Sequence, residues 1–277
     1  MKVYKTTSAI IIESGNQFYS LKEDWDTLIN RENLLGYLDE HCRNSEPFDE
    51  AEELLRSGLE PPAGSQEIWA SGVTYYQSRK ARMDESKDSG GGDFYDRVYS
   101  AKRPELFLKA APHRAVGSGQ HVRIRRDSSW NVPEPELTLV INSKAEIIGY
   151  TVGNDMSSRD IEGENPLYLP QAKCYDGSAA IGPCIYVTAD PLGGDTKIKI
   201  EISRDSQVVF EGVVEINMIK RKFEELVHYL FLEYSFPSGA LLMTGTGVVP
   251  PNEFTLEVGD EIKISIDKIG TLINKVA

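Results

Sequence analysis

Residues 130–141 read Trp-Asn-Val-Pro-Glu-Pro-Glu-Leu-Thr-Leu-Val-Ile and combine a strand pattern with two closely spaced carboxylates. The apolar run over residues 137–141 is typical of a strand buried in a sheet. The two prolines before it favour extended backbone and remove two N–H donors, which suits a strand end or a bulge. Side chains two residues apart on a strand point to the same side, so Glu134 and Glu136 can converge on one cation. The pattern alone also fits two ordinary surface glutamates.

Strand patterns continue along the chain on both sides of this stretch. Apolar and polar residues alternate over residues 122–125, 198–202 and 261–267, which predicts half-buried strands. Between them, residues 223–234 carry one apolar stripe at helical spacing, so we expect one helix in this half of the chain. No strand–helix repeat is present. The pattern therefore predicts an α+β, β-rich fold rather than a doubly wound sheet or a β/α barrel.

The N-terminal region has its own pattern of elements. Short strands are expected within residues 1–20, followed by helices over residues 33–43 and 48–56. Glycine and proline residues over positions 58–64 then interrupt the chain. We place a boundary near residue 65, between a small N-terminal α/β domain (1–65) and a main domain (66–277).

The composition narrows the class of partner and the compartment. The 277 residues carry a formal net charge of −13, which disfavours nucleic acid and anionic membranes as partners. Cys42, Cys174 and Cys184 are an odd number and widely spaced, so a disulfide framework is not expected. The sequence begins without an apolar run of secretory type and contains no stretch long enough to span a membrane. We expect a cytoplasmic protein.

A second segment supplies a third carboxylate. Residues 149–160 read Gly-Tyr-Thr-Val-Gly-Asn-Asp-Met-Ser-Ser-Arg-Asp, and Asp155 follows an apolar strand pattern there. Three carboxylates suit Mg²⁺ or Mn²⁺ and leave positions open for water or substrate. Lys173, further along, is suited to a substrate carboxylate. Arg159 and Asp160 are expected to pair with each other around the turn. Spacing alone does not show that these segments meet.

Four motifs in order resemble those of the fumarylacetoacetate hydrolase superfamily. They are E-x-E-L at residues 134–137, G-Y-T-x-x-N-D-x-S-x-R-D at 149–160, T-G-T at 244–246, and a closing G-D at 259–260 with G-x-L-x-N at 270–274. The resemblance covers the chain from about residue 70 to its end.

This resemblance implies a fold, a site and an assembly. The fold is the family's mixed β-sandwich roll, and the assembly is at least a homodimer, with a homotetramer also open. Glu134, Glu136 and Asp155 are implied as metal ligands for Mg²⁺, with Mn²⁺ as an alternative. Lys173 is implied in the substrate site.

The segment before residue 100 distinguishes branches of the family. Hydrolases of the family carry N-Y-x-x-H followed closely by an acidic residue, but the corresponding stretch here ends in Ser78. The four histidines of the chain lie elsewhere, and a serine without a partnered base activates water poorly. Residues 75–99 are highly charged and contain three consecutive glycines, which fits either a solvated helix with a loop or a mobile lid.

Residues 72–75, residues 103–109 and the spacing of the metal motifs resemble the branch that dehydrates 2-keto-3-deoxy-pentonates. This implies a Mg²⁺-dependent lyase that forms 2,5-dioxopentanoate from a small 2-keto acid. We expect Glu105, Lys173 and Glu134 to be catalytic. Glu85 is a weaker acid–base candidate, and Glu105 also fits a structural ion pair with Arg103 or Lys109. We expect substrate contacts from Ser78, Lys173, Thr244 and Thr246.

Two other kinds of function remain open at this stage. One is an acylpyruvate or fumarylacetoacetate-type C–C hydrolase, or a 2-keto acid decarboxylase, on the same metal site. The other is a metal-dependent binding protein without turnover, or a structural β-domain.

Overall fold

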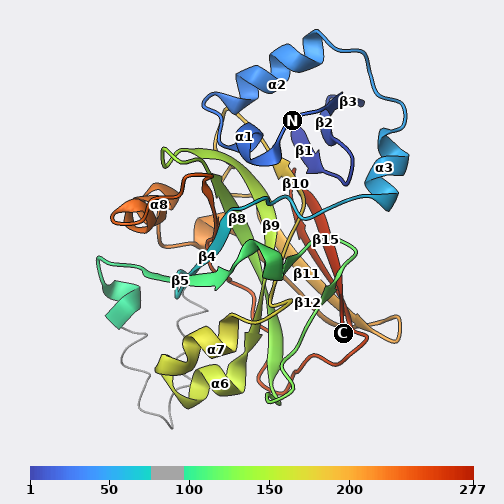
Figure 1. Cartoon of the computed structure of the whole chain (residues 1–277). Helices are drawn as coiled ribbons and strands as arrows, with labels where there is room; N and C mark the ends of the chain where they lie inside the picture. The colour runs from blue at the N-terminus through green and yellow to red at the C-terminus, as the bar shows by residue number, and fades with distance from the viewer. Residues whose placement is uncertain (76–96) are drawn as a thin grey trace.

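The computed structural model describes residues 1–75 and 97–277, and two sheets dominate it (Figure 1). The larger sheet has the order β3-β2-β1-β10-β9-β8-β13-β4-β5, and β6 pairs with β10 off this path. Its strands are β1 (Lys2–Lys5), β2 (Ile10–Ser14), β3 (Gln17–Leu21), β4 (Glu67–Gly72), β5 (Glu105–Ala110), β6 (Ala115–Val116), β8 (Asn131–Ile141), β9 (Ile147–Ser158), β10 (Ala179–Tyr186) and β13 (Ala240–Met243).

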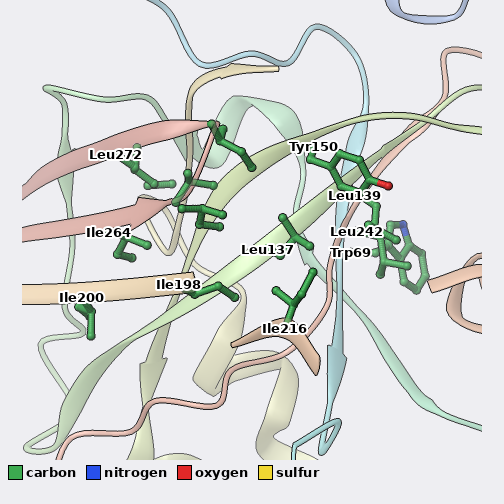
Figure 2. Packing of buried hydrophobic residues seen from close by; sticks show 14 of the residues in the cluster. Trp69, Leu137, Leu139, Tyr150, Ile198, Ile200, Ile216, Leu242, Ile264 and Leu272 are labelled. Atoms are coloured by element: carbon green, nitrogen blue, oxygen red, sulfur yellow. The ribbon is translucent and has the colours of Figure 1, made fainter. Parts of the chain in front are cut away.

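The smaller sheet has five strands in the order β12-β11-β14-β15-β7. Its strands are β7 (His121–Val122), β11 (Lys197–Arg204), β12 (Gln207–Glu215), β14 (Glu261–Ile266) and β15 (Gly270–Val276). One apolar core joins the two sheets, and it includes Leu137 from β8, Ile198 from β11 and Leu272 from β15 (Figure 2). The expected α+β, β-rich sandwich of this family is therefore confirmed.

Alternation along β8 directs its side chains to two faces. Leu137 and Leu139 enter the core between the sheets, whereas Val140 enters a second core beneath the N-terminal elements. Because side chains alternate along a strand, Glu134 and Glu136 lie on the same face as Val140. The two glutamates therefore lie on the face of the large sheet that points away from the small sheet.

Most of the helices lie at the two ends of the molecule. Three form with the N-terminal strands, namely α1 (Trp25–Ile29), α2 (Leu34–Arg43) and α3 (Ala51–Ser57). Two more, α6 (Arg159–Glu164) and α7 (Leu169–Lys173), lie at the opposite end of the molecule in Figure 1. Helix α8 (Phe223–Phe231) matches the apolar stripe in the sequence. None of the helices in the described parts of the chain is long and apolar enough to cross a membrane.

Several expectations about single elements need correction. The strand expected over residues 122–125 ends at Val122, because the backbone N–H of Arg123 donates to the carbonyl of Gly177 instead of continuing the ladder. The expectation of a single helix after residue 100 is wrong, since α6 and α7 are also present. These two helices are too short, at six and five residues, to show a helical period in the sequence.

The N-terminal strands β1 to β3 extend the large sheet beyond β10. Residue 65 lies between α3 and β4, in the segment that joins the N-terminal elements to the rest of the sheet. The division into domains at this point stays a prediction. Residues 76–96, on which the expected lid, Ser78 and Glu85 fall, lie outside the described residues.

Candidate active site

The antiparallel pair β8–β9 brings the three expected carboxylates together. Glu134 lies opposite Asp155 in the register, and Glu136 lies opposite Gly153, which has no side chain to compete for space. All three acidic side chains are buried, and one oxygen from each lies within 4.8 Å of the others. The register of two strands thus builds an oxygen-rich group from residues some twenty positions apart in the sequence.

The electrostatics of this group favour a bound cation. Burial raises the pKa of Glu136 well above its usual value, and the negative charges of Asp155 and Glu134 raise it further. The ammonium of Lys173 and the backbone N–H of Gly245, 2.5 Å from Glu136 Oε2, act in the opposite direction. Three buried carboxylates in contact are costly unless a cation neutralises them. The donor set therefore fits a hard divalent ion such as Mg²⁺ or Mn²⁺.

Lys173 lies at the end of α7, with its side chain buried beside the carboxylates. Its Nζ atom lies 2.8 Å from Glu134 Oε2, 3.0 Å from Asp155 Oδ2 and 2.5 Å from Ser157 Oγ. The structure thus places this lysine among the carboxylates that the sequence selected. After β9 the chain passes through α6, and α7 then packs back against β9 and presents the lysine to the strand pair.

Arg159 belongs to the same group, which the sequence analysis missed. Its Nη2 atom lies 2.6 Å from Glu134 Oε1, and both side chains are buried. The expected pairing of Arg159 with Asp160 is therefore wrong, since Asp160 instead accepts hydrogen bonds from Ser128 and Ser129. The arginine points inward because it is the first residue of α6, directly after β9. Its position within the N-D-x-S-x-R-D motif was the available signal.

Lys109 on β5 is a second cation that the sequence analysis did not place in the site. Its Nζ atom lies 2.7 Å from Asp155 Oδ1, and the side chain is fully buried. Sequence reasoning considered it only as a partner for Glu105. The strand pattern of residues 105–110 carried no sign that this lysine points inward.

A small cavity opens onto the carboxylates. The residues that line it are Ser71, Gly72, Val73, Phe107, Glu134, Glu136, Asp155, Arg159, Lys173, Gly245 and Thr246. Larger hollows lie elsewhere on the surface, one of them over β11 and β12. Within the described residues, the group of Glu134, Glu136 and Asp155 is the one acidic, histidine or cysteine cluster arranged to hold a metal. We therefore place the candidate active site at the small cavity.

Of the other expected site residues, Thr246 lines this cavity, whereas Thr244 and Glu105 are not among its lining residues. The Thr246 hydroxyl donates to the carbonyl of Val248, whereas the Thr244 hydroxyl donates to the carbonyl of Leu137. Glu105 is half-buried, and its carboxylate lies so close to Gly72 that a Cβ atom there would come within 2.0 Å of Oε2. Gly72 is part of the cavity wall, so Glu105 lies next to that wall.

The fold and the carboxylate site define a known class. The sequence model described as "Fumarylacetoacetate (FAA) hydrolase C-terminal" matches residues 68–277. The chain therefore belongs to the fumarylacetoacetate hydrolase family.

Individual relatives within this family have more specific names. The chain is 46% identical over 216 residues to a Haloferax volcanii protein named "Probable 2-keto-3-deoxyxylonate dehydratase", covering 78% of this chain and 73% of that protein. It is 43% identical over 221 residues to the 2-dehydro-3-deoxy-D-arabinonate dehydratase of Saccharolobus solfataricus, covering 79% and 72%. A solved 2-keto-3-deoxy-D-arabinonate dehydratase, complexed with magnesium and 2,5-dioxopentanoate, superposes with a TM-score of 0.86 at 34% identity, over 100% of this chain and 98% of that one.

Proposed function

We propose that this chain is a Mg²⁺-dependent lyase that removes water from a 2-keto-3-deoxy-pentonate to give 2,5-dioxopentanoate. The observation that carries the proposal is the convergence of Glu134, Glu136 and Asp155 with Lys173 on one buried cavity. Relatives at 43% and 46% identity are named as dehydratases of such acids, and a solved relative is complexed with magnesium and this product. The conclusion is thus a hydro-lyase of sugar-acid catabolism.

Glu134, Glu136 and Asp155 are the residues that hold the magnesium ion in this proposal. When bound there, the ion supplies a Lewis acid that polarises the 2-keto group of the substrate. Lys173 lines the same cavity, and its ammonium neutralises the substrate carboxylate. Two of its present acceptors are Glu134 and Asp155, which are also two of the residues that would hold the metal. Lys173 can therefore exchange a carboxylate of the protein for one of the substrate.

Glu105 is the proposed base and acid. It removes a proton from C3 and returns it to the departing C4 hydroxyl, so that the two leave together as water. Loss of a proton from C5 and addition of a proton at C3 then move the double bond from C3=C4 to C4=C5. The resulting enol gains a proton at C4 and loses its O–H proton, which makes C5 the aldehyde of the product. The contact between the Glu105 carboxylate and Gly72, a residue of the cavity wall, supports this role. Thr246 and Thr244 are proposed to order the substrate, as is Ser78.

C–C bond hydrolysis on the same metal site is the weaker alternative. Hydrolysis needs a base that activates water, and in the family's hydrolases this base is a histidine near position 78. His41, His113, His121 and His228 all fall within the described residues, and none lines the cavity. The chemistry of the cavity wall therefore favours dehydration over hydrolysis.

A panel of 2-keto acids tests the proposal. The purified protein is incubated with 2-keto-3-deoxy-arabinonate, 2-keto-3-deoxy-xylonate, acetylpyruvate and oxaloacetate, with Mg²⁺ or with excess EDTA, and the products are identified by mass. We expect loss of one water from a pentonate with Mg²⁺ and none with EDTA. Absence of dehydration across the pentonates, or dehydration that survives complete chelation, would contradict the proposal.

We also propose that the protein is a cytoplasmic homodimer or homotetramer. All three cysteines are free, which suits a reducing compartment. The edge strand β12 and the turn after it expose Val209, Val213 and Met218, and an exposed apolar edge is typical of a surface that pairs with another chain. Light scattering coupled to size exclusion measures the assembly. A monomer that persists at high protein concentration would exclude this part of the proposal.

A further inference from the structure

Lys109 is a fully buried lysine whose partners are all internal. It lies on β5, near the edge of the large sheet, and its side chain has no exposed surface. Its Nζ atom lies 2.7 Å from Asp155 Oδ1 and donates to the carbonyl of Met156 at 2.8 Å. It also donates to the carbonyl of Lys173. An ammonium has three N–H donors, and here each has one acceptor.

Because all three N–H donors of Lys109 have acceptors within the protein, Lys109 differs from the residues that can contact a ligand. Lys109 does not line the cavity, whereas Lys173 does. Each of its three acceptors belongs to a segment that carries the site, since Asp155 and Met156 are on β9 and Lys173 ends α7. Lys109 therefore acts on the site through other residues and not by touching a substrate.

Asp155 is held from two sides. Its Oδ1 atom faces Lys109 and its Oδ2 atom faces Lys173, so two ammonium groups fix the plane of one carboxylate. Groups that orient a metal ligand in this way set its geometry and its affinity for the ion. The Lys109 ammonium also binds the carbonyl at the end of α7, where the last carbonyls of a helix lack partners within the helix. It thereby fixes the backbone from which the Lys173 side chain extends.

We infer that Lys109 is a positioning residue for the metal site, which holds the Asp155 carboxylate and the end of α7 in register with each other. The inference rests on the proposed magnesium role of the three carboxylates. A positioning role and a simple charge effect predict opposite changes in Mg²⁺ affinity when Lys109 is removed. If Lys109 acted only as a nearby positive charge, its removal would relieve repulsion and tighten the binding of Mg²⁺. If it positions Asp155, its removal weakens the binding of Mg²⁺.

Calorimetric titration of Mg²⁺ into the metal-free protein shows whether the loss of Lys109 weakens or tightens Mg²⁺ binding. We expect Lys109→Met to raise the Kd for Mg²⁺ by about 10- to 100-fold, the range found for partners that orient metal ligands. At saturating Mg²⁺, we expect KM for the substrate to change much less than kcat. Lys199→Met is the matched control, since Lys199 is exposed on β11. The Kd of this variant for Mg²⁺ should equal that of the wild type. An unchanged or lower Kd in folded Lys109→Met overturns the inference.

A second variant covers the case in which Lys109→Met does not fold. Lys109→Arg keeps the charge, but its planar fork cannot direct donors to three acceptors around one nitrogen. Weaker Mg²⁺ binding in Lys109→Arg supports the positioning role, and wild-type binding contradicts it. Failure of the wild type itself to bind Mg²⁺ would instead overturn the proposed function. The two failures are therefore distinguishable.

Discussion

Glu134 and Asp155 lie directly opposite each other on the antiparallel strands β8 and β9, so two carboxylates share one cross-strand position. Like charges in such a position are destabilising. Lys173 contacts both carboxylates, Arg159 contacts the first, and Lys109 contacts the second. The site is thus a buried network of opposite charges, with the cavity on one side of it.

Loss of the negative charge at Glu136 should affect Mg²⁺ binding without lowering the stability of the metal-free protein. Glu136→Gln keeps the acceptor for the N–H of Gly245 but removes one of three buried like charges. In EDTA we expect the variant to be at least as stable as the wild type. Mg²⁺ at a hundredfold excess over Kd stabilises a protein by about 2.7 kcal/mol, and we expect Glu136→Gln to lose most of this gain. Thermal unfolding with and without Mg²⁺ measures both effects.

Glu211→Gln is the control for this experiment, because Glu211 is exposed on β12 in the other sheet. It should keep the full Mg²⁺-dependent stabilisation. We further expect Glu136→Gln to abolish turnover. Wild-type stabilisation by Mg²⁺ in Glu136→Gln would exclude this glutamate from the metal site.

Removal of Arg159 should destabilise the protein itself. Its partner Glu134 is buried and also contacts Lys173, so loss of Arg159 leaves that carboxylate only partly compensated, at a cost of up to about 3–5 kcal/mol. We therefore expect Arg159→Met to lower the free energy of unfolding by up to that amount in EDTA. Arg114→Met breaks a surface pair with Asp176, which is worth about 0–1 kcal/mol. Equal effects of the two variants in urea unfolding would contradict the buried-network account.

Gly72→Ala tests the position of Glu105. A Cβ atom at Gly72 would meet the end of the flexible Glu105 side chain, so that carboxylate must move while the backbone need not. We expect a fall in kcat of at least tenfold with little change in Tm. The control is Gly193→Ala, whose Cβ atom would meet the carboxylate of Asp195 in the same manner on the surface. Unchanged kcat in Gly72→Ala would argue against Glu105 as the acid–base group.

Lys173→Met tests the binding role of this lysine at saturating Mg²⁺. Loss of a charge-assisted contact costs roughly 1.5–3 kcal/mol, so we expect KM to rise about tenfold to over a hundredfold with a small change in kcat. Calorimetric titration of pyruvate, a non-reactive analogue, measures the binding effect directly. Unchanged pyruvate affinity would move Lys173 from substrate binding to the chemical step.

The short motifs of the sequence were sufficient to select the carboxylates, but not their surroundings. The spacing of Glu134 and Glu136 indicated that both lie on one face of a strand. The structure places Asp155 opposite Glu134 on the neighbouring strand. The register that joins these segments depends on pairing between strands and cannot be read from either strand alone. Lys109 was missed because a buried cation with internal partners has the same local sequence pattern as an exposed one, whereas Arg159 was missed although its motif position was a signal.

The same limit applies to the fold. Strongly periodic elements such as α8 and β14 were predicted because burial of one face imposes the period. The short helices α6 and α7 were not predicted, since tertiary contacts rather than periodicity fix them. They carry Arg159 and Lys173, so the least predictable elements supply two of the three cations of the site.

The central claim is that this metal site dehydrates sugar acids, and a comparison of specificity constants tests it most directly. We would measure kcat/KM for 2-keto-3-deoxy-pentonates and for acylpyruvates at one Mg²⁺ concentration with one preparation. The account predicts a higher kcat/KM for dehydration of a pentonate, because Glu105 lies next to a residue of the cavity wall and none of the four histidines lines the cavity. A higher kcat/KM for acylpyruvate cleavage would contradict it.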